Sequence, residues 1–239
     1  MSDWLPALGQ APRRVLSDNV LDELRAVIVS GGIEAGQRLR ENELASQMNV
    51  SRGPVREALV RLEQEGLVAL ERHRGARVVV LSRDDREKLY RLRRALEELA
   101  GEYACSNATE ADFDRANAVI EEFVRSENST MTPAAAAAFD IRFHDSIYIA
   151  AHNDPLYRAW AVLRSQVHYF MTTRMMLRPD YNETWEREHM RLLELLRERK
   201  KTPCRKFIGL HVEGSFRRIL LDQLPDDSEH SAEVAHASR

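Results

Sequence analysis

The stretch that decides the fold runs from Asn49 to Gly66 and reads NVSRGPVREALVRLEQEG. Ser51 is a residue type that caps helix N-termini, because its side-chain oxygen can accept a backbone N–H of the first turn. The Gly-Pro pair that follows fits a first helical turn, where proline loses no intrahelical hydrogen bond. Val55, Leu59 and Leu62 then repeat at helical spacing and form one apolar face. The pattern predicts a helix that begins directly after Ser51.

Two arginines lie on another face of this predicted helix, close to its start. Arg52 and Arg56 are one turn apart. Fork-shaped guanidinium groups at a helix N-terminus suit guanine edges and phosphates in a DNA major groove. The alternative is a solvated basic edge, which is the better interpretation of two arginines alone. The surrounding sequence decides between the two.

The flanking segments predict two further helices and a hairpin. An apolar stripe from about Ser17 ends at Gly31–Gly32, and Glu41–Met48 forms a second, short helix. After the Arg-bearing helix, Leu67–Leu70 and Ala76–Leu81 alternate as strands on either side of a turn. Three helices followed by a hairpin predict a winged helix-turn-helix domain over residues 14–81.

The hairpin turn carries the sequence RHRG, residues 72–75. In a winged helix the tip of the wing lies against DNA, where Arg72, Arg74 and Arg77 would contact phosphates beside Gly75. Without the preceding helix-turn-helix pattern, the same hairpin would be a charged surface turn. The helix-turn-helix ahead of it favours DNA contact.

A second, all-helical domain is predicted over residues 82–224, between an N-terminal arm (1–13) with the winged helix and a C-terminal tail (225–239). Ser82 and Asp85 have the spacing of a capping box at its first helix. The predicted fold class is therefore mainly α, a winged helix-turn-helix followed by a helical bundle. The expected helices are 84–107, 110–127, 133–152, 155–177, 182–200 and 203–222.

Composition agrees with two domains and sets limits on the partners. The chain has 239 residues and a formal net charge of −3, and its first 82 residues hold 11 Arg against 11 Asp and Glu. DNA binding must then depend on where the charges lie. Cys105 and Cys204 lack metal-type spacing, and no apolar run reaches the length of a membrane span. We expect a cytoplasmic protein with reduced cysteines and no membrane partner.

Four metal-ligand side chains fall on inward faces of the predicted bundle. Asp140 and His144 share a stripe with Phe143, while His189 and His211 occupy apolar stripes of two later helices. A buried carboxylate needs a cation or several donors. One Asp and three His suit a divalent transition metal, zinc first, with nickel or manganese as alternatives. From these residues alone, hydrogen-bonded core pairs remain an equal alternative.

Arg93 is predicted to face inward as well, on a stripe with Leu89, Leu92, Leu96 and Ala100. A buried arginine is costly unless it is paired. Its partner could be the carboxylate of a bound ligand, or Asp140 or a glutamate of the bundle. The sequence leaves both possibilities open.

The first domain resembles the DNA-binding domain of GntR-family bacterial transcription regulators. The resemblance rests on VIVSGGIEAGQRLRENELASQMNVSRGPVREALVRLEQEGLV and RHRGARVVV, within residues 20–80. It implies a homodimer on a palindromic double-stranded DNA operator, with half-sites about one helical turn apart. By position, Ser51, Arg52 and Arg56 match the recognition-helix contacts, and Gly75 matches the wing tip. Gly53 and Asn42 depart from the family's usual residues at two further contact positions.

The second domain resembles the FCD subfamily of these regulators, which includes the fatty-acid and vanillate-type proteins. The carrying segments are YRLRRALE, FDIRFHDSIYIAAHNDPL, EHMRLLELL and GLHVEGSF. Six expected helices favour the vanillate-type group. The resemblance implies a metal held by Asp140, His144, His189 and His211, and a small organic acid effector whose carboxylate lies near Arg93.

Two other functions are alternatives to a metabolite-responsive regulator. The first is a metalloenzyme, which would need a general base beside the metal. Glu188 adjoins His189, but neighbours on a helix point about 100° apart, so it is a poor candidate. The second is a constitutive DNA-binding dimer with a purely structural metal. The sequence favours a regulator that is not an enzyme.

Overall fold

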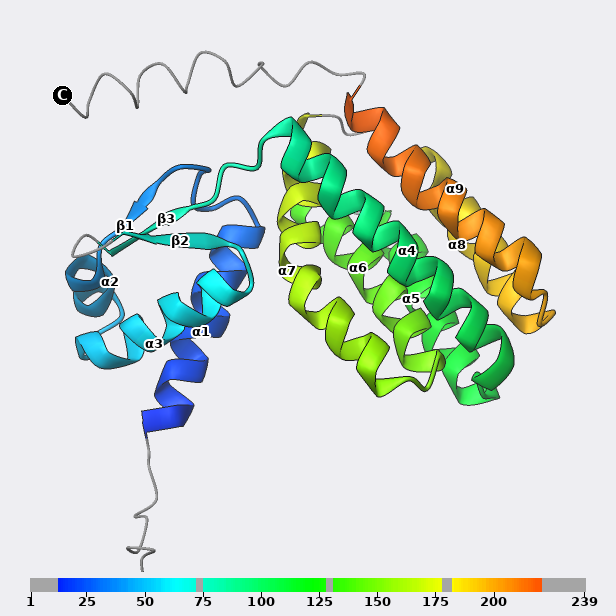
Figure 1. Cartoon of the computed structure of the whole chain (residues 1–239), viewed down its shortest axis with the longest axis horizontal. Coiled ribbons are helices and arrows are strands. Elements are labelled where there is room, and N and C mark those ends of the chain that lie inside the picture. Colours follow the sequence, from blue (N-terminus) through cyan, green and yellow to red (C-terminus); the bar gives the residue numbers. More distant parts are fainter. Residues whose placement is uncertain (1–12, 72–74, 128–130, 178–181, 221–239) are drawn as a thin grey trace, which may run out of the picture. The chain divides into compact units, whose positions relative to one another are not determined.

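The structure is a computed structural model and describes residues 13–71, 75–127, 131–177 and 182–220. The chain divides between Val79 and Val80 into two compact units (Figure 1). Residues 1–12 of the predicted arm, the predicted tail and the predicted DNA contact Arg74 lie outside the described residues.

The first unit is a winged helix, as predicted. Its strands form one antiparallel sheet in the order β1-β3-β2. Strand β1 was not predicted, because two residues are too short to show an alternating pattern. The elements are α1 (Arg13–Val29), β1 (Arg38–Leu39), α2 (Glu41–Gln47), α3 (Arg52–Gln64), β2 (Val68–Glu71) and β3 (Gly75–Val78).

Helix α1 packs on α3 and fixes the orientation of the Arg-bearing helix. It begins at Arg13, earlier than the stripe from Ser17 indicated. It ends where predicted, because Gly31 adopts φ 78° and its N–H bonds back to the Ile28 carbonyl. Leu21, Ile28, Leu59, Leu62 and Leu67 are fully buried between these helices and the sheet, and are the core of this unit.

Ser51 occupies the N-cap of α3 with an extended backbone, but its hydroxyl makes no capping hydrogen bond. The predicted position of the cap is therefore correct, but the predicted hydrogen bond is missing. A capping oxygen can accept from the N–H three residues later, and Pro54 at that position has no N–H.

Gly75 is required by the sheet. It adopts φ 91°, and a Cβ at this position would collide with the backbone carbonyl oxygen of Leu39 in β1. The register pairs Leu39 with Ala76 and Glu71 with Gly75, so this glycine lets β1 approach the start of β3.

The second unit contains six helices in its described residues, each within a few residues of the predicted range. The predicted capping box is confirmed, since Ser82 and Asp85 exchange both hydrogen bonds. Helix α4 packs along α9, and α6 packs against α5 and α7. The helices are α4 (Arg83–Asn107), α5 (Glu110–Glu127), α6 (Pro133–Ala150), α7 (Asp154–Leu177), α8 (Asn182–Arg197) and α9 (Lys201–Leu220).

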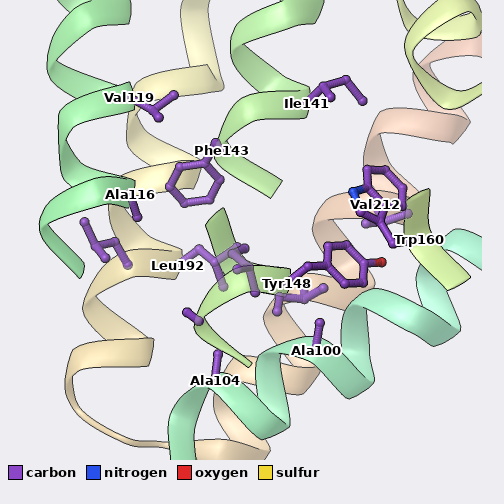
Figure 2. Close-up of a cluster of buried hydrophobic side chains, with 14 of the residues drawn as sticks. Ala100, Ala104, Ala116, Val119, Ile141, Phe143, Tyr148, Trp160, Leu192 and Val212 are labelled. Atoms are coloured by element: carbon purple, nitrogen blue, oxygen red, sulfur yellow. The ribbon is translucent and has the colours of Figure 1, made fainter. Parts of the chain in front are cut away.

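Aromatic and aliphatic side chains fill the space between these helices (Figure 2). Tyr148 of α6 stacks on Trp160 of α7 with ring centroids 4.8 Å apart. Trp185 of α8 stacks on Phe123 of α5 at 3.9 Å. One expectation for α4 was wrong: Leu92, placed on the inward stripe, is 47% exposed, because the buried stripe passes through Leu89 and Arg93 instead.

Candidate metal centre and nucleic-acid interface

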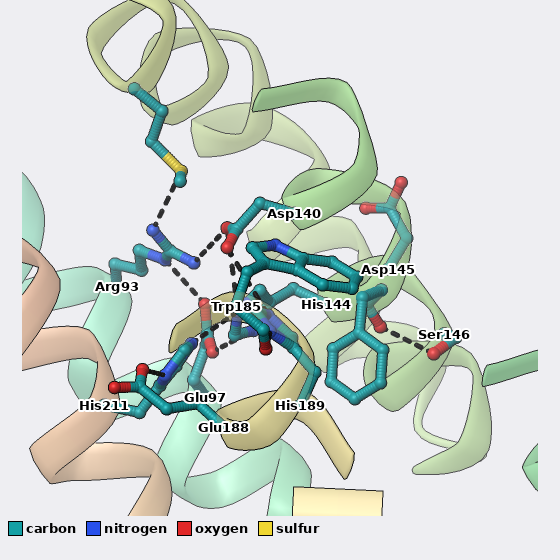
Figure 3. Close-up of polar contacts among 12 residues, drawn as sticks. Arg93, Glu97, Asp140, His144, Asp145, Ser146, Trp185, Glu188, His189 and His211 are labelled. Atoms are coloured by element: carbon teal, nitrogen blue, oxygen red, sulfur yellow. Dashed lines mark hydrogen bonds and ion pairs between the residues drawn. The ribbon is translucent and has the colours of Figure 1, made fainter. Parts of the chain in front are cut away.

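The four predicted metal ligands lie together inside the helical unit (Figure 3). Asp140 and His144 project from α6, His189 from α8 and His211 from α9. One ligand-type atom from each of the four lies within 4.8 Å of every other. Each side chain is at most 7% exposed. Residues far apart in the sequence thus form a single buried cluster that could hold a metal ion.

Each histidine of this cluster has its Nδ1 atom against an oxygen outside the cluster. Because those oxygens are acceptors, Nδ1 carries the hydrogen, and the Nε2 lone pair points inward. Acceptors placed in this way orient metal-binding histidines. The pairs are His144 with Glu97 Oε2 at 2.5 Å, His189 with the Trp185 carbonyl at 2.7 Å and His211 with Glu188 Oε2 at 2.8 Å.

The inward atoms are all acceptors and face one another. His144 Nε2 lies 3.3 Å from His211 Nε2, and His189 Nε2 lies 3.4 Å from Asp140 Oδ1. Lone pairs at these distances repel unless a cation lies between them. For zinc–ligand distances of about 2.0–2.1 Å, two ligands at a tetrahedral angle are about 3.3 Å apart. The donor set and these two separations therefore fit a first-row divalent metal.

The electrostatics agree with a cation site. Burial lowers the pKa of His189 to about 4, which keeps the ring neutral and able to ligate near neutral pH. Burial alone would raise the pKa of Asp140, but the His144 ring, the His189 contact and the Arg93 guanidinium hold it well below its ordinary value. Asp140 is thus an anion within the cluster.

Arg93 is buried, as predicted, and pairs with two carboxylates of the bundle. Its Nε donates to Glu97 Oε1 at 2.6 Å, and its Nη2 lies 3.3 Å from Asp140 Oδ2. Its Nη1 lies 3.3 Å from the Met171 sulfur. The sequence left open whether Arg93 pairs with a ligand carboxylate or with a carboxylate of the protein. In the structure its partners are the protein carboxylates Glu97 and Asp140. Arg91 and Arg94 are more exposed, in agreement with the helical stripe.

A small cavity of about 30 Å³ adjoins the cluster, enough for one or two water molecules. Arg93 is not part of its wall. The side chains around it come from α6 to α9 and include three of the four ligands. The lining residues are Asp140, Met171, Arg174, Met175, Thr184, Trp185, Glu188, His189, His211 and Ser215.

Sequence reasoning missed Glu97 and missed the contact that Glu188 makes with His211. Glu97 is four residues after Arg93 on the same inward face, a spacing that could have revealed it. The pKa of Glu97 is about 2, because Arg93 and His144 outweigh the effect of burial. Glu188 was considered only as a base beside His189, but its carboxylate contacts His211 on the neighbouring helix.

Four of the predicted DNA contacts line a groove of about 720 Å³, namely Asn42, Arg52, Arg56 and Gly75. Arg52 and Arg56 have side chains 59% and 61% exposed. Ser51 and Gly53 are exposed but are not part of its wall. The lining residues are Arg38, Arg40, Glu41, Asn42, Arg52, Arg56, Leu59, Val60, Leu70, Glu71 and Gly75.

A winged helix with an arginine-lined groove, joined to a helical unit with an internal polar site, defines a DNA-binding transcription regulator with a ligand-binding domain. Residues 16–78 match the gntR family of bacterial regulatory proteins, and residues 88–214 match the FCD domain. The chain belongs to the GntR family and carries an FCD domain. Proteins of this family and its relatives are transcription regulators, and this chain is not an enzyme.

Individual proteins resemble the chain over most of its length. The Nta operon transcriptional regulator of Aminobacter aminovorans is 29% identical, covering 80% of this chain and 89% of the relative. The Uxu operon transcriptional regulator of Escherichia coli is 26% identical over 85% of this chain and 86% of its own. The E. coli McbR/YncC structure has the same fold, with a TM-score of 0.73 at 21% identity over 86% of this chain and 97% of that one.

Across the described ranges, no helix is long and apolar enough to cross a membrane.

Proposed function

We propose that this regulator binds a palindromic operator as a homodimer, and that a small carboxylate bound at a divalent metal in the FCD domain sets its DNA affinity. The observation that carries the proposal is the convergence of three Nε2 lone pairs and the Asp140 carboxylate in one buried cluster. Zinc is the first candidate for this donor set, with nickel and manganese as alternatives.

Asp140, His144, His189 and His211 would hold the metal, and a metal that takes a fifth or sixth ligand would offer an open position to a carboxylate oxygen. The cavity beside the cluster reaches three of these ligands and is the place for an effector group. Arg93 does not line this cavity, and its Nη2 lies 3.3 Å from Asp140, which does. We therefore propose that Arg93 acts at the effector site chiefly through Asp140.

The effector can change DNA affinity only by binding two states of the dimer with different affinities. The exposed face of α4 supports a dimer through the helical unit. Leu92, Leu99 and Tyr103 are 47%, 42% and 41% exposed and recur on one side of the helix. An apolar stripe of this kind suits a self-complementary contact between two copies.

At the other unit, we propose that Arg52 and Arg56 contact bases or phosphates in the major groove, with Ser51, Gly53 and Asn42 beside them. Arg74 and Gly75 form the wing contact. The exposure of both arginines at one groove supports this assignment. Because its proposed partner is DNA, we place the protein in the cytoplasm.

The test begins with metal analysis of the purified protein and a thermal-shift screen of small organic acids. A duplex is then selected by the protein from a random library, and its binding is titrated with and without the stabilising acid. We expect Arg56→Ala to lose specific binding and His144→Ala to lose the acid response while still binding the duplex. A normal acid response in His144→Ala would refute the metal–effector mechanism.

A purely structural metal gives a different result. Chelation would then lower the melting temperature without changing acid binding by the protein that remains folded. We expect chelation to remove both the metal's contribution to stability and the acid response.

A further inference from the structure

Arg52 and Arg56, the two arginines at the start of α3, donate to the same carboxylate. Glu41 begins α2, and its Oε2 accepts from Arg56 Nη2 at 2.9 Å and from Arg52 Nη2 at 3.1 Å. Its Oε1 accepts from Arg56 Nε at 3.2 Å. The Glu41 side chain is only 19% exposed, whereas the arginine side chains are 59% and 61% exposed. A half-buried acid thus lies behind two outward-facing cations.

The contact with Arg56 uses a particular edge of the guanidinium group. A guanidinium can form paired hydrogen bonds along its Nε–Nη2 edge or along its Nη1–Nη2 edge. Glu41 engages the first edge with both of its oxygens. The second edge is left for an outside partner, and it is the edge suited to the O6 and N7 acceptors of guanine.

The charge on Glu41 has a separate effect. The hydrogen bond from Arg56 outweighs the effect of burial and lowers the pKa of Glu41, so the group is anionic at neutral pH. Together, Arg52, Arg56 and Glu41 carry a single net positive charge. Non-specific DNA binding depends on the number of phosphates that cations neutralise. An anion at this place therefore weakens binding to arbitrary sequences.

We propose that Glu41 is a positioning residue that sets the sequence specificity of this regulator. It holds Arg56 with its Nη1–Nη2 edge toward a guanine, restrains Arg52, and lowers affinity for DNA of any other sequence. This inference rests on the proposed DNA contact of Arg56. A purely structural role for Glu41 would leave base preference and salt dependence unchanged.

The test uses the full-length protein, a duplex selected by the wild type from a random library, and a scrambled duplex of the same length. Fluorescence anisotropy is measured over a series of salt concentrations. For Glu41→Gln, we expect tighter binding to the scrambled duplex at low salt and a salt slope steeper by about one. We expect the ratio of specific to non-specific affinity to fall about tenfold or more. Repeated selection should show lost preference at one guanine in each half-site.

Glu43→Gln is the matched control. Glu43 lies in the same helical turn, is 61% exposed, and pairs with Arg40 at 2.5 Å instead of with the recognition arginines. We expect this variant to keep the wild-type base preference. An equal loss of preference in both variants would overturn the assignment to Glu41.

Glu41→Asp distinguishes the orientation of Arg56 by Glu41 from the effect of the negative charge of Glu41. It is also the second variant if Glu41→Gln folds poorly. The shorter acid keeps the negative charge but cannot reach both oxygens to Arg56. We expect a near-wild-type salt slope together with a reduced guanine preference. Wild-type preference in this variant would overturn the positioning role.

The Arg56→Ala protein distinguishes the two proposals. If Arg56→Ala keeps the wild-type base preference, the proposed DNA contact of Arg56 is wrong. If Arg56→Ala loses this preference but Glu41→Gln keeps it, the proposed DNA contact stands and the proposed role of Glu41 is wrong.

Discussion

His144 Nδ1 lies 2.5 Å from Glu97 Oε2, and this contact turns the opposite ring nitrogen toward Asp140. The other oxygen of Glu97 accepts from Arg93 Nε at 2.6 Å. A candidate metal ligand, a carboxylate and a guanidinium group therefore form a continuous chain with side chains at most 2% exposed. In such a chain, the loss of any member leaves a buried polar partner unsatisfied.

Glu97→Gln should weaken metal binding about 10- to 100-fold, because the acceptor that orients His144 is lost. Both oxygens of Glu97 face a nitrogen, Oε1 that of Arg93 Nε and Oε2 that of His144 Nδ1, whereas the amide of glutamine can accept through only one of its two ends. Competition with a chromophoric zinc chelator measures the affinity.

Glu102→Gln is the control for this variant, since Glu102 lies on the same helix, is 44% exposed and only approaches Arg205 at 3.9 Å. Its metal affinity should equal that of the wild type. If the two variants bind metal equally well, Glu97 does not orient the site.

Arg93→Met should lower the free energy of unfolding of the metal-free protein by about 3–5 kcal/mol, the usual cost of leaving buried charges without a partner. Two carboxylates, Glu97 and Asp140, lose their shared cation in this variant. Urea denaturation gives the difference.

The comparison variant is Arg91→Met, whose arginine is 79% exposed and pairs with Glu87 on the surface. Exposed pairs contribute about 1 kcal/mol or less, so this change should be small. A similarly small effect of Arg93→Met would show that Arg93 is not needed to hold the two carboxylates.

Much of this architecture is encoded locally. The helix ends of the second unit follow from nearby capping and proline residues, such as Ser82 with Asp85 and Thr132 before Pro133. The inward positions of Asp140 and His144 follow from helical periodicity within one segment. Their proximity to His189 and His211 depends on helix packing, so the pattern left a metal site and hydrogen-bonded core pairs equally open, and the family resemblance favoured the metal site.

The features that were missed depend on contacts between segments distant in sequence. Strand β1 exists because Leu39 pairs with Ala76, and no local signal marks two residues. The pairing of Glu188 with His211 joins two helices, so the direction of Glu188 on its own helix could not reveal it. Leu92 and Arg93 are neighbours on α4, and only the packed bundle shows which of them is buried.

Metal-free protein should lose stability as the pH falls below neutrality. The pKa of His189 is about 4 in the folded protein, below its ordinary value of 6.5. Between these values the unfolded chain takes up a proton that the folded protein does not, so the free energy of unfolding falls. The pKa of Glu97 is lowered from 4.5 to about 2, so its contribution is present above pH 4.5 and is lost as the pH falls to about 2.

Urea denaturation at a series of pH values from 7.5 to 4, chosen around these pKa values, measures the first of these losses. His189→Gln should make the slope shallower. The substitution should not abolish the pH dependence, because burial also lowers the pKa of His168 to about 4. An unchanged slope in His189→Gln would contradict the assignment to this ring.

Gly101→Ala should destabilise the helical unit by about 1–3 kcal/mol, the usual cost of overfilling a packed core. A Cβ at Gly101 would collide with Ile208 Cδ1 and lie 3.3 Å from Cys204 Sγ, and both neighbours are fully buried where α4 meets α9. The gain in helix propensity from glycine to alanine, about 1 kcal/mol, offsets only part of this cost.

Gly209→Ala is the matched substitution on the facing helix, and its outcome should differ. The new Cβ would meet Glu98 Oε1 and Arg94 Nε, which are the ends of flexible side chains at the surface of the α4–α9 contact. These ends can shift without opening the core, so the propensity gain should leave this variant as stable as the wild type or more stable. Chemical denaturation measures the free energy of unfolding of both variants. Equal destabilisation would contradict this prediction, because it would mean that the α4–α9 contact is as tightly packed around Gly209 as around Gly101.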